Sequence, residues 1–276
     1  MLKVLVAESE TVEEREARRA HAGKSAGESY AATLRQLRPD AEITIVAPAD
    51  DDAPHYSVEA LRAFDAVFVT GSPLHVYDDT PEVTRQIAFM RRVFASTTPS
   101  FGSCAGLQLA VATAGGKVRR MPERMEAGIA RRITPTEAGR AHPLLAGRAP
   151  SWDAPAIHGD EVEQLPDDAT LLASNAVTTV QAAEIRHDGG VFWGVQYHPE
   201  LAPGEIAVAL RRQVPDLIEA GLASSEAAVL QRADELDALQ AEPERRSLYW
   251  TLGIDREFAI EAHRRTELSN FLEWLG

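Results

Sequence analysis

Short runs of continuous hydrophobic residues recur in the first third of the chain. They lie at residues 2–7, 43–47 and 64–70, and their lack of polar alternation is typical of strands buried on both faces of a sheet. Longer polar or amphipathic segments separate them. Thr80 and Pro81 supply a cap and a first-turn proline for a helix that runs to about residue 94. This alternation predicts an α/β fold with a parallel sheet covered by helices on both faces.

The polar, Ala-rich segment of residues 11–37 departs from this simple alternation. Its charged first half predicts a solvated helix or a mobile arm. The tripeptide Gly23-Lys24-Ser25 resembles the end of a phosphate loop, but no strand precedes it and no glycine lies five residues before Gly23. The sequence therefore does not predict a nucleotide site in this segment.

Beyond Gly115 and Gly116 the pattern changes to short strands separated by turns. A Gly189-Gly190 hairpin signal precedes the last of these strands. The expected strands are residues 117–120, 128–133, 156–162, 169–173, 180–185 and 191–197.

From about residue 204 the pattern becomes helical. Helices are expected at residues 205–213, 215–220, 224–240 and 255–274. We therefore expect a domain of residues 1–203 followed by a helical extension of residues 204–276. The apolar face of the extension is expected to pack on the domain itself, with a homodimer interface and the docking of a partner as alternatives.

Composition narrows the classes of function. Of the 276 residues, 45% are hydrophobic and 25% charged, which suits a globular chain with a buried core. A formal net charge of −14 argues against binding to nucleic acid or to an anionic membrane. The N-terminal apolar run is too short for a secretory signal, no 18-residue apolar run follows, and a single cysteine suits a reducing compartment. We expect a cytoplasmic protein.

The single cysteine, Cys104, stands in the pattern Gly102-Ser103-Cys104-Ala105-Gly106, between a short segment and an apolar helical pattern. A strand that turns sharply into a helix needs small neighbours, and the residue at the corner projects clear of the sheet. The helix N-terminus favours an anion, so a thiol placed there favours its nucleophilic thiolate form. The alternative is a buried structural cysteine, the usual fate of a lone cysteine.

His198 and Glu200 follow the last predicted strand, with Pro199 between them. Residues two apart in an extended segment point to the same side, so the carboxylate is expected beside the imidazole. A carboxylate there fixes the tautomer of the ring and stabilises its protonated form. In isolation the motif would favour a surface turn. Because the carboxyl ends of parallel strands meet at one edge of a sheet, the sequence predicts that Cys104 and His198 meet there.

Three ordered motifs together resemble class I glutamine amidotransferases, over about residues 2–203. The loop at Gly71-Ser72-Pro73 also falls where that family keeps its oxyanion loop. The motifs are Gly102-Ser103-Cys104-Ala105-Gly106-Leu107-Gln108, His158-Gly159-Asp160-Glu161-Val162 and Gly194-Val195-Gln196-Tyr197-His198-Pro199-Glu200.

This resemblance implies a flavodoxin-like domain with a mostly parallel central sheet, a Cys-His-Glu triad and no cofactor. The triad would hydrolyse the side-chain amide of glutamine through a γ-glutamyl thioester. A metal site at His158, Asp160 and Glu161 is disfavoured, because adjacent ligands alternate faces on a strand. The implied roles are Cys104 as nucleophile, His198 as acid and base, Glu200 as its orienting group, Gly71 and Ala105 as oxyanion donors, Gln108 as a substrate contact, and His158 and Asp160 as supporting residues.

Two positions depart from the family pattern. Ala105 replaces a larger residue and leaves the floor of the pocket more open, and Ser72 stands where a second glycine is common.

Three functions follow from these motifs. The first is glutamine hydrolysis with ammonia passed to a separately encoded acceptor enzyme, such as a synthetase. The second is a free-standing hydrolase of γ-glutamyl amines or peptides. The third, a catalytically silent binding module, is disfavoured by the intact Cys104, His198 and Glu200.

Overall fold

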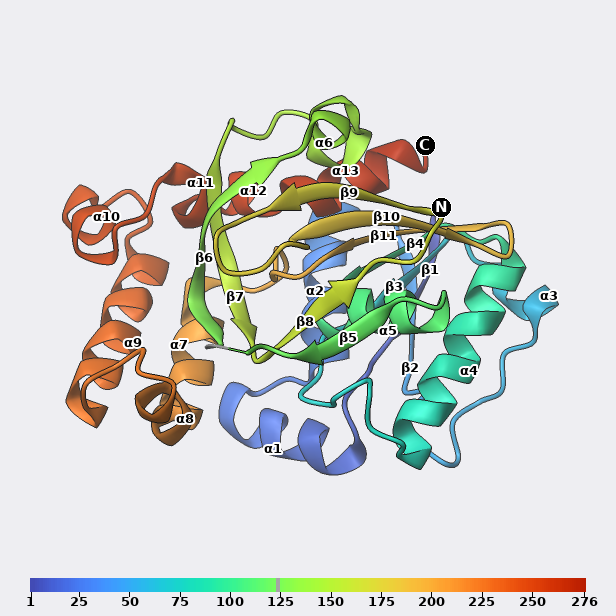
Figure 1. Cartoon of the computed structure of the whole chain (residues 1–276), viewed down its shortest axis with the longest axis horizontal. Helices are drawn as coiled ribbons and strands as arrows, with labels where there is room; N and C mark the ends of the chain where they lie inside the picture. Colours follow the sequence, from blue (N-terminus) through green and yellow to red (C-terminus); the bar gives the residue numbers. More distant parts are fainter. Residues whose placement is uncertain (123–124) are drawn as a thin grey trace.

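The computed structural model describes residues 1–122 and 125–276. Within these residues, nine strands form one mixed sheet that curls around the centre of the molecule, as Figure 1 shows. The strands at one end of the sheet are parallel: β2 (Glu42–Val46), β1 (Lys3–Ala7), β3 (Ala66–Val69), β4 (Ser100–Ser103) and β11 (Gly190–Val195). Those at the other end pair antiparallel: β10 (Ala182–His187), β9 (Ala169–Ser174), β6 (Glu126–Pro135) and β7 (Trp152–His158). The predicted α/β class with a flavodoxin-like parallel core is confirmed.

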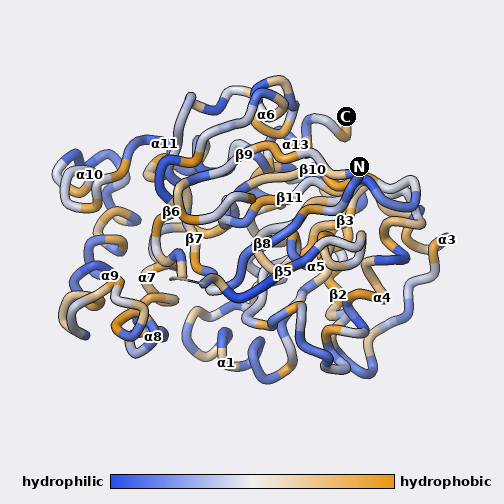
Figure 2. Tube along the Cα trace, viewed as in Figure 1, coloured by the Kyte–Doolittle hydropathy of each residue, from blue (hydrophilic) through white to orange (hydrophobic). Residues whose placement is uncertain are grey.

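Two further strands, β5 (Lys117–Arg120) and β8 (Asp160–Gln164), form a separate antiparallel pair. The sequence pattern predicted one strand over residues 156–162, but Gly159 separates β7 from β8. Figure 2 shows that hydrophobic residues follow the central strands, such as β3 and β11, whereas β5 is largely hydrophilic. The second pair therefore lies at the edge of the core, where Val162 of β8 joins the second hydrophobic cluster and Val118 of β5 packs against it.

Side chains of the parallel strands alternate between two hydrophobic clusters, one on each face of the sheet. On β1, Val4 and Val6 join the first cluster, whereas Leu5 and Ala7 join the second. Helix α2 (Ala26–Leu37) covers the first face together with the C-terminal helix α13 (Thr266–Trp274). Helices α3 (Val58–Leu61), α4 (Pro81–Ser96) and α5 (Ala105–Thr113) cover the second. Burial on both faces explains the continuous apolar runs in these strands.

Residues 11–37 form two capped helices, α1 (Val12–Ala22) and α2, so of the two predicted alternatives the helix is confirmed and the mobile arm is wrong. Thr11 and Ser25 each close a capping box, and Gly23 ends α1 in the left-handed conformation. Arg15 is buried and pairs with Asp50, which holds the charged half of α1 against the domain. The Gly23-Lys24-Ser25 tripeptide is thus a junction between two helices.

The extension contains seven helices within the described residues, and α10 was not predicted. Residues 255–274 were predicted to form one helix, and this prediction is wrong because the backbone is extended at Ile260. The break lets Phe258 and Phe271 enter different hydrophobic clusters. Besides α13, the helices are α7 (Pro203–Arg212), α8 (Val214–Glu219), α9 (Glu226–Ala241), α10 (Arg246–Leu252), α11 (Arg256–Ala259) and α12 (Glu261–Arg264). Two short elements of the domain, α6 (Glu137–Ala141) and η1 (Pro143–Leu145), complete the chain.

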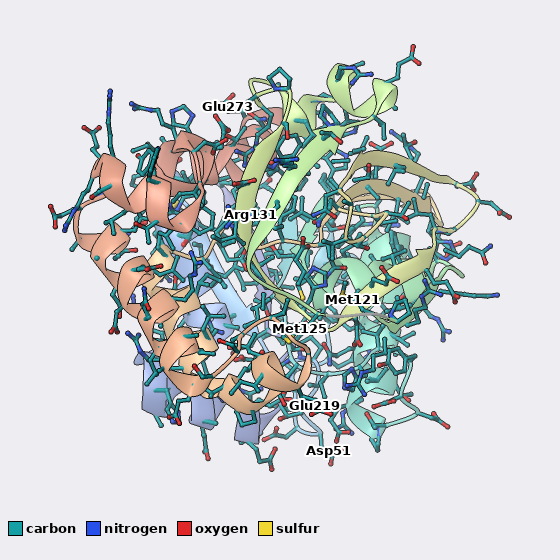
Figure 3. All side chains as sticks on the ribbon, turned by 60° about the vertical axis from the view of Figure 1, so that its left-hand side comes forward. Asp51, Met121, Met125, Arg131, Glu219 and Glu273 are labelled. Atoms are coloured by element: carbon teal, nitrogen blue, oxygen red, sulfur yellow. The ribbon has the colours of Figure 1, made fainter. Side chains whose placement is uncertain are left out.

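Buried ion pairs and hydrogen bonds connect the extension to the rest of the chain. Arg148 pairs with Glu257 at 2.8 Å and with Glu267 at 2.6 Å, and the side chains of Arg148 and Glu267 are 1% and 0% exposed. Tyr197, directly before His198, donates a hydrogen bond of 2.7 Å to Glu267. Arg131 on β6, labelled in Figure 3, donates to backbone carbonyls at the end of α10. The division of the chain at residue 203 remains a prediction.

None of the helices in the described part of the chain has both the length and the apolar character that a membrane span requires.

Candidate active site

Cys104 occupies a sharp turn between β4 and α5. Its backbone has φ 52° and ψ −112°, outside the common regions for a residue with a side chain, and its N–H donates to Val195 of β11 at 2.8 Å. Only a glycine fits at position 106, because a Cβ there would lie 2.4 Å from the carbonyl oxygen of Val69. The packing of β3, β4 and β11 therefore holds the cysteine at the corner.

His198 and Glu200 lie in a turn after β11, which ends at Val195 rather than at residue 197 as predicted. The pair still meets: His198 Nδ1 is 2.7 Å from Glu200 Oε1. The turn, and not strand alternation, makes this contact. A hydrogen bond of 2.8 Å from the His198 N–H to Pro155 anchors the segment to β7.

The charge state of His198 follows from its neighbours. Burial of the ring by itself lowers the pKa of His198, but the carboxylate of Glu200 and the thiol of Cys104 outweigh burial and raise that pKa to about 10. The imidazole is therefore protonated at neutral pH. With Nδ1 held by Glu200, Nε2 is the nitrogen left for the reacting atoms.

Gly71 lies directly against both Cys104 and His198. A Cβ at position 71 would lie 2.8 Å from His198 Cε1 and 3.4 Å from Cys104 Cβ. These distances place the imidazole and the cysteine beside one another at the carboxyl ends of β3, β4 and β11. Ala105 is the first residue of α5, so its N–H has no partner within the helix. Gly71 and Ala105 therefore both lie beside Cys104, and their role as oxyanion donors stays a prediction.

A hydrogen-bonded chain that the sequence analysis missed continues behind Glu200. Ser103 donates from Oγ to Glu200 Oε2 at 2.9 Å, and the hydroxyl of Tyr30 lies 3.2 Å from the same Oγ. Ser103 and Tyr30 are buried, and burial followed by the charge of Glu200 raises the pKa of Tyr30. Ser103 directly precedes Cys104 in the sequence, and this position is the only local signal. Tyr30, on α2, gives none.

A Ser103→Ala variant should lower kcat about tenfold with little change in KM. The reason is that Glu200 loses one of the two contacts that hold it beside His198, and a hydrogen bond to a charged group contributes about 1.5–3 kcal/mol. Steady-state kinetics on a γ-glutamyl amide, together with thermal unfolding, would measure both effects. A Tyr30→Phe variant serves as the matched control and should lose less, because it leaves the Ser103–Glu200 bond intact. An unchanged kcat, or a rise in KM alone, would contradict a positioning role.

Gln108 lies one helical turn beyond Cys104 and is buried. Its Nε2 donates to the backbone carbonyl of Asp160 at 3.3 Å and to Gln196 at 3.2 Å. Gln108 thereby links α5 to the first residue of β8. The structure thus brings the second sequence motif close to Cys104.

His158 Nδ1 lies 2.8 Å from the backbone carbonyl of Asp160, but the two side chains have different partners. His158 Nε2 lies 3.0 Å from Glu126, whereas Asp160 is 2.6 Å from His75 Nδ1 and accepts a 3.0 Å bond from Tyr77. His75 and Tyr77 were not singled out in the sequence. Among the described residues, no group of three His, Cys, Asp or Glu side chains has the geometry of a metal site.

Two cavities meet at Cys104, and we name each by one of its residues. The Gln108 cavity has a volume of about 190 Å³, and the His198 cavity has a volume of about 250 Å³. The Gln108 cavity is lined by residues that include Cys104, Gln108, His75, Ile157, His158 and Asp160. The His198 cavity is lined by residues that include Cys104, His198, Glu200, Tyr30, Glu10, Arg18, Glu205 and Arg212.

The fold and the site define an α/β protein with a cysteine at a nucleophile elbow and a histidine–glutamate pair beside it. The family model for glutamine amidotransferase class-I matches residues 21–214. The chain belongs to the class I glutamine amidotransferase family.

Relatives divide between two activities. The chain is 36% identical over 225 residues to a gamma-glutamyl-L-1-hydroxyisopropylamide hydrolase of a Pseudomonas species, covering 80% of this chain and 75% of the relative. It is 32% identical over 148 residues to a glutamine-hydrolyzing GMP synthase subunit of Sulfolobus acidocaldarius, covering 54% of this chain and 73% of that relative. These relatives support an amidohydrolase activity.

Solved structures agree on the fold. A glutamine amidotransferase from Thermotoga maritima superposes with a TM-score of 0.67 at 14% identity, covering 99% of this chain and 97% of that one. A glutamine amidotransferase from Methylobacillus flagellatus gives 0.56 at 20% identity, covering 93% and 96%.

Proposed function

We propose that the protein hydrolyses the γ-glutamyl amide bond of a small amine through a thioester on Cys104. The observation that carries this proposal is the position of Cys104 at the elbow, beside a His198 ring that Glu200 holds at 2.7 Å. Sequence reasoning ranked glutamine first as the substrate. Two features, the size of the His198 cavity and the 36% identical relative, favour a larger amine.

In the first step, the sulfur of Cys104 attacks the amide carbon and forms the C–S bond. The backbone N–H groups of Gly71 and Ala105 would stabilise the negative charge on the amide oxygen. His198 transfers a proton from Nε2 to the departing nitrogen as the C–N bond breaks, releasing the amine. Glu200 stabilises the protonated ring before this transfer.

In the second step, His198 takes a proton from water, which attacks the thioester. The C–S bond breaks, glutamate leaves, and the thiolate and the protonated imidazole are restored. Both steps need the same proton carrier on the same side of the acyl carbon. His198 and Glu200 line the His198 cavity, so the leaving amine and the later water belong in that cavity.

The γ-glutamyl part of the substrate then belongs in the Gln108 cavity, on the other side of Cys104. Gln108 and His75 line it, together with two carboxylates, Asp160 and Asp216. These groups suit the charged amino and carboxylate groups of an amino acid. The volume of the His198 cavity, about 250 Å³, far exceeds the roughly 15 Å³ that a single water-sized molecule requires. This difference favours a leaving amine of several heavy atoms over ammonia.

The second candidate is glutamine hydrolysis with ammonia delivered to a separately encoded synthetase. The likeness to the glutamine-hydrolyzing GMP synthase relative supports it. The cysteine chemistry would be the same, and only the leaving group and its destination differ.

Incubating the pure protein with L-glutamine and with γ-glutamyl amides of small amines separates these candidates. We expect faster release of amine than of ammonia, measured as kcat/KM. Rapid glutamine hydrolysis with no turnover of the amides would favour the second candidate. No turnover of any substrate, with no labelling of Cys104 by a glutamine-like diazoketone, would contradict both and favour a silent binding module.

A further inference from the structure

Arg18, on α1, reaches the His198 cavity without a close acceptor for its guanidinium. Its Nη1 lies 3.8 Å from Glu10 and its Nη2 lies 3.8 Å from Glu205, both beyond hydrogen-bond distance. Its Nε is buried and has no hydrogen-bond partner among the residues that the structure describes. The side chain of Arg18 is 22% exposed, so its Nη groups can reach solvent, but a buried donor such as Nε is nearly always satisfied in native proteins.

The two carboxylates beside Arg18 are already engaged elsewhere. Glu10 accepts from the N–H of Ala26, the first residue of α2, at 3.1 Å. Glu205 accepts from the N–H of Ala202 at 3.0 Å and closes the cap of α7. Each carboxylate therefore lies near the guanidinium of Arg18 at the wall of the cavity, but accepts no hydrogen bond from it. The donors of Arg18 remain available to a molecule in the cavity.

We propose that Arg18 determines specificity for the leaving amine by donating hydrogen bonds to a neutral oxygen, a hydroxyl carried by that amine. This inference rests on the proposed function, because it assigns the His198 cavity to the amine. The substrate class is then the γ-glutamyl amides of small amino alcohols.

The charges around Arg18 select a hydroxyl over a carboxylate. A carboxylate close enough to bond Arg18 would also lie near Glu10 and Glu205, and like charges at such distances repel strongly in a partly buried site. A purely alkyl amine would displace water from the guanidinium without replacing its hydrogen bonds, which costs affinity. Only a neutral hydrogen-bond acceptor avoids both the charge repulsion and the loss of hydrogen bonds. The other arginine at this cavity, Arg212, is exposed, so solvent satisfies its donors and it does not need a ligand group.

Three matched substrates test this assignment: γ-glutamyl ethanolamide, γ-glutamyl propylamide and γ-glutamylglycine. The first two have the same number of heavy atoms and differ by one hydroxyl against one methyl. We expect kcat/KM for the ethanolamide to exceed that for the propylamide by about tenfold, and γ-glutamylglycine to be the slowest. In an Arg18→Met variant the ethanolamide-to-propylamide ratio should fall to about one. An Arg19→Met control, on an exposed neighbour that pairs with Glu28, should keep the wild-type ratio.

A wild-type ratio near one, an unchanged ratio in Arg18→Met, or a preference for γ-glutamylglycine would each overturn the assignment. Binding to a catalytically inactive Cys104→Ala variant gives a readout that does not depend on turnover. The ethanolamide should bind that variant about tenfold more tightly than the propylamide, and equal dissociation constants would overturn the role of Arg18. Selective binding without turnover by the wild-type protein would contradict the proposed hydrolysis but leave the role of Arg18 supported.

Discussion

A Cys104→Ala variant is expected to lose at least about 10³-fold in kcat on every γ-glutamyl amide that the wild-type protein cleaves. The sulfur is the proposed nucleophile, and the chain has no second cysteine to replace it. The same variant should lower the pKa of His198 below its wild-type value of about 10, because the thiol is one of the two groups that raise it. Steady-state kinetics and the NMR titration of the His198 ring would measure the two effects.

A Ser100→Ala variant provides the matched control, on the strand β4 that leads to Cys104. Ser100 is buried like Cys104, but its hydroxyl donates to the Val191 carbonyl, away from the cavities. Its activity should stay within about twofold of wild type. If Cys104→Ala retained turnover while remaining folded, or if the pKa of His198 did not move, the thioester mechanism would be untenable.

An Arg148→Met variant should lower the free energy of unfolding by about 3–5 kcal/mol. The change leaves Glu267, whose side chain is 0% exposed, without its positive partner. Burial alone would lower the pKa of Arg148, but the charges of Glu267 and other neighbours raise it above its ordinary value, so the guanidinium stays charged in the folded state. Urea denaturation followed by tryptophan fluorescence would measure the loss.

Two further variants define the origin of that loss. Exposed Arg140, which bonds only to the Pro135 carbonyl among the described residues, should change stability by less than about 0.5 kcal/mol when replaced by Met. Adding Glu267→Gln to Arg148→Met should restore part of the lost stability, because the unpaired buried charge is removed. Equal effects of Arg148→Met and Arg140→Met would show that the buried pair does not stabilise the fold.

Glu267 also connects the C-terminal extension to the candidate active site. It accepts the hydroxyl hydrogen bond of Tyr197, which directly precedes His198. The C-terminal helix α13 therefore supports the segment that carries the proposed acid and base. We expect Arg148→Met to reduce activity only as far as it reduces the folded fraction at the assay temperature.

Local patterns in the sequence predicted the parallel strands, because burial on both faces leaves a continuous apolar run such as residues 3–7. The turn at Cys104 could also be predicted from the sequence, because a sharp strand-to-helix turn requires glycines at fixed positions. The helix prediction was wrong for a segment whose residues pack into two different hydrophobic clusters. Residues 255–274 read as one helix, yet the extended backbone at Ile260 sends Phe258 and Phe271 into separate clusters.

The sequence by itself thus determined the alternation of elements and the corner that holds Cys104, whereas the contact between His198 and Glu200 comes from a turn and not from the strand alternation that predicted it. Only the tertiary structure decided that Tyr30 and Ser103, 73 residues apart, meet behind Glu200, and that Arg18 borders the same cavity as His198. The physical reason is that periodicity and turn chemistry act over a few residues. A hydrogen bond between distant residues depends instead on how whole helices pack against the sheet, to within a fraction of an ångström.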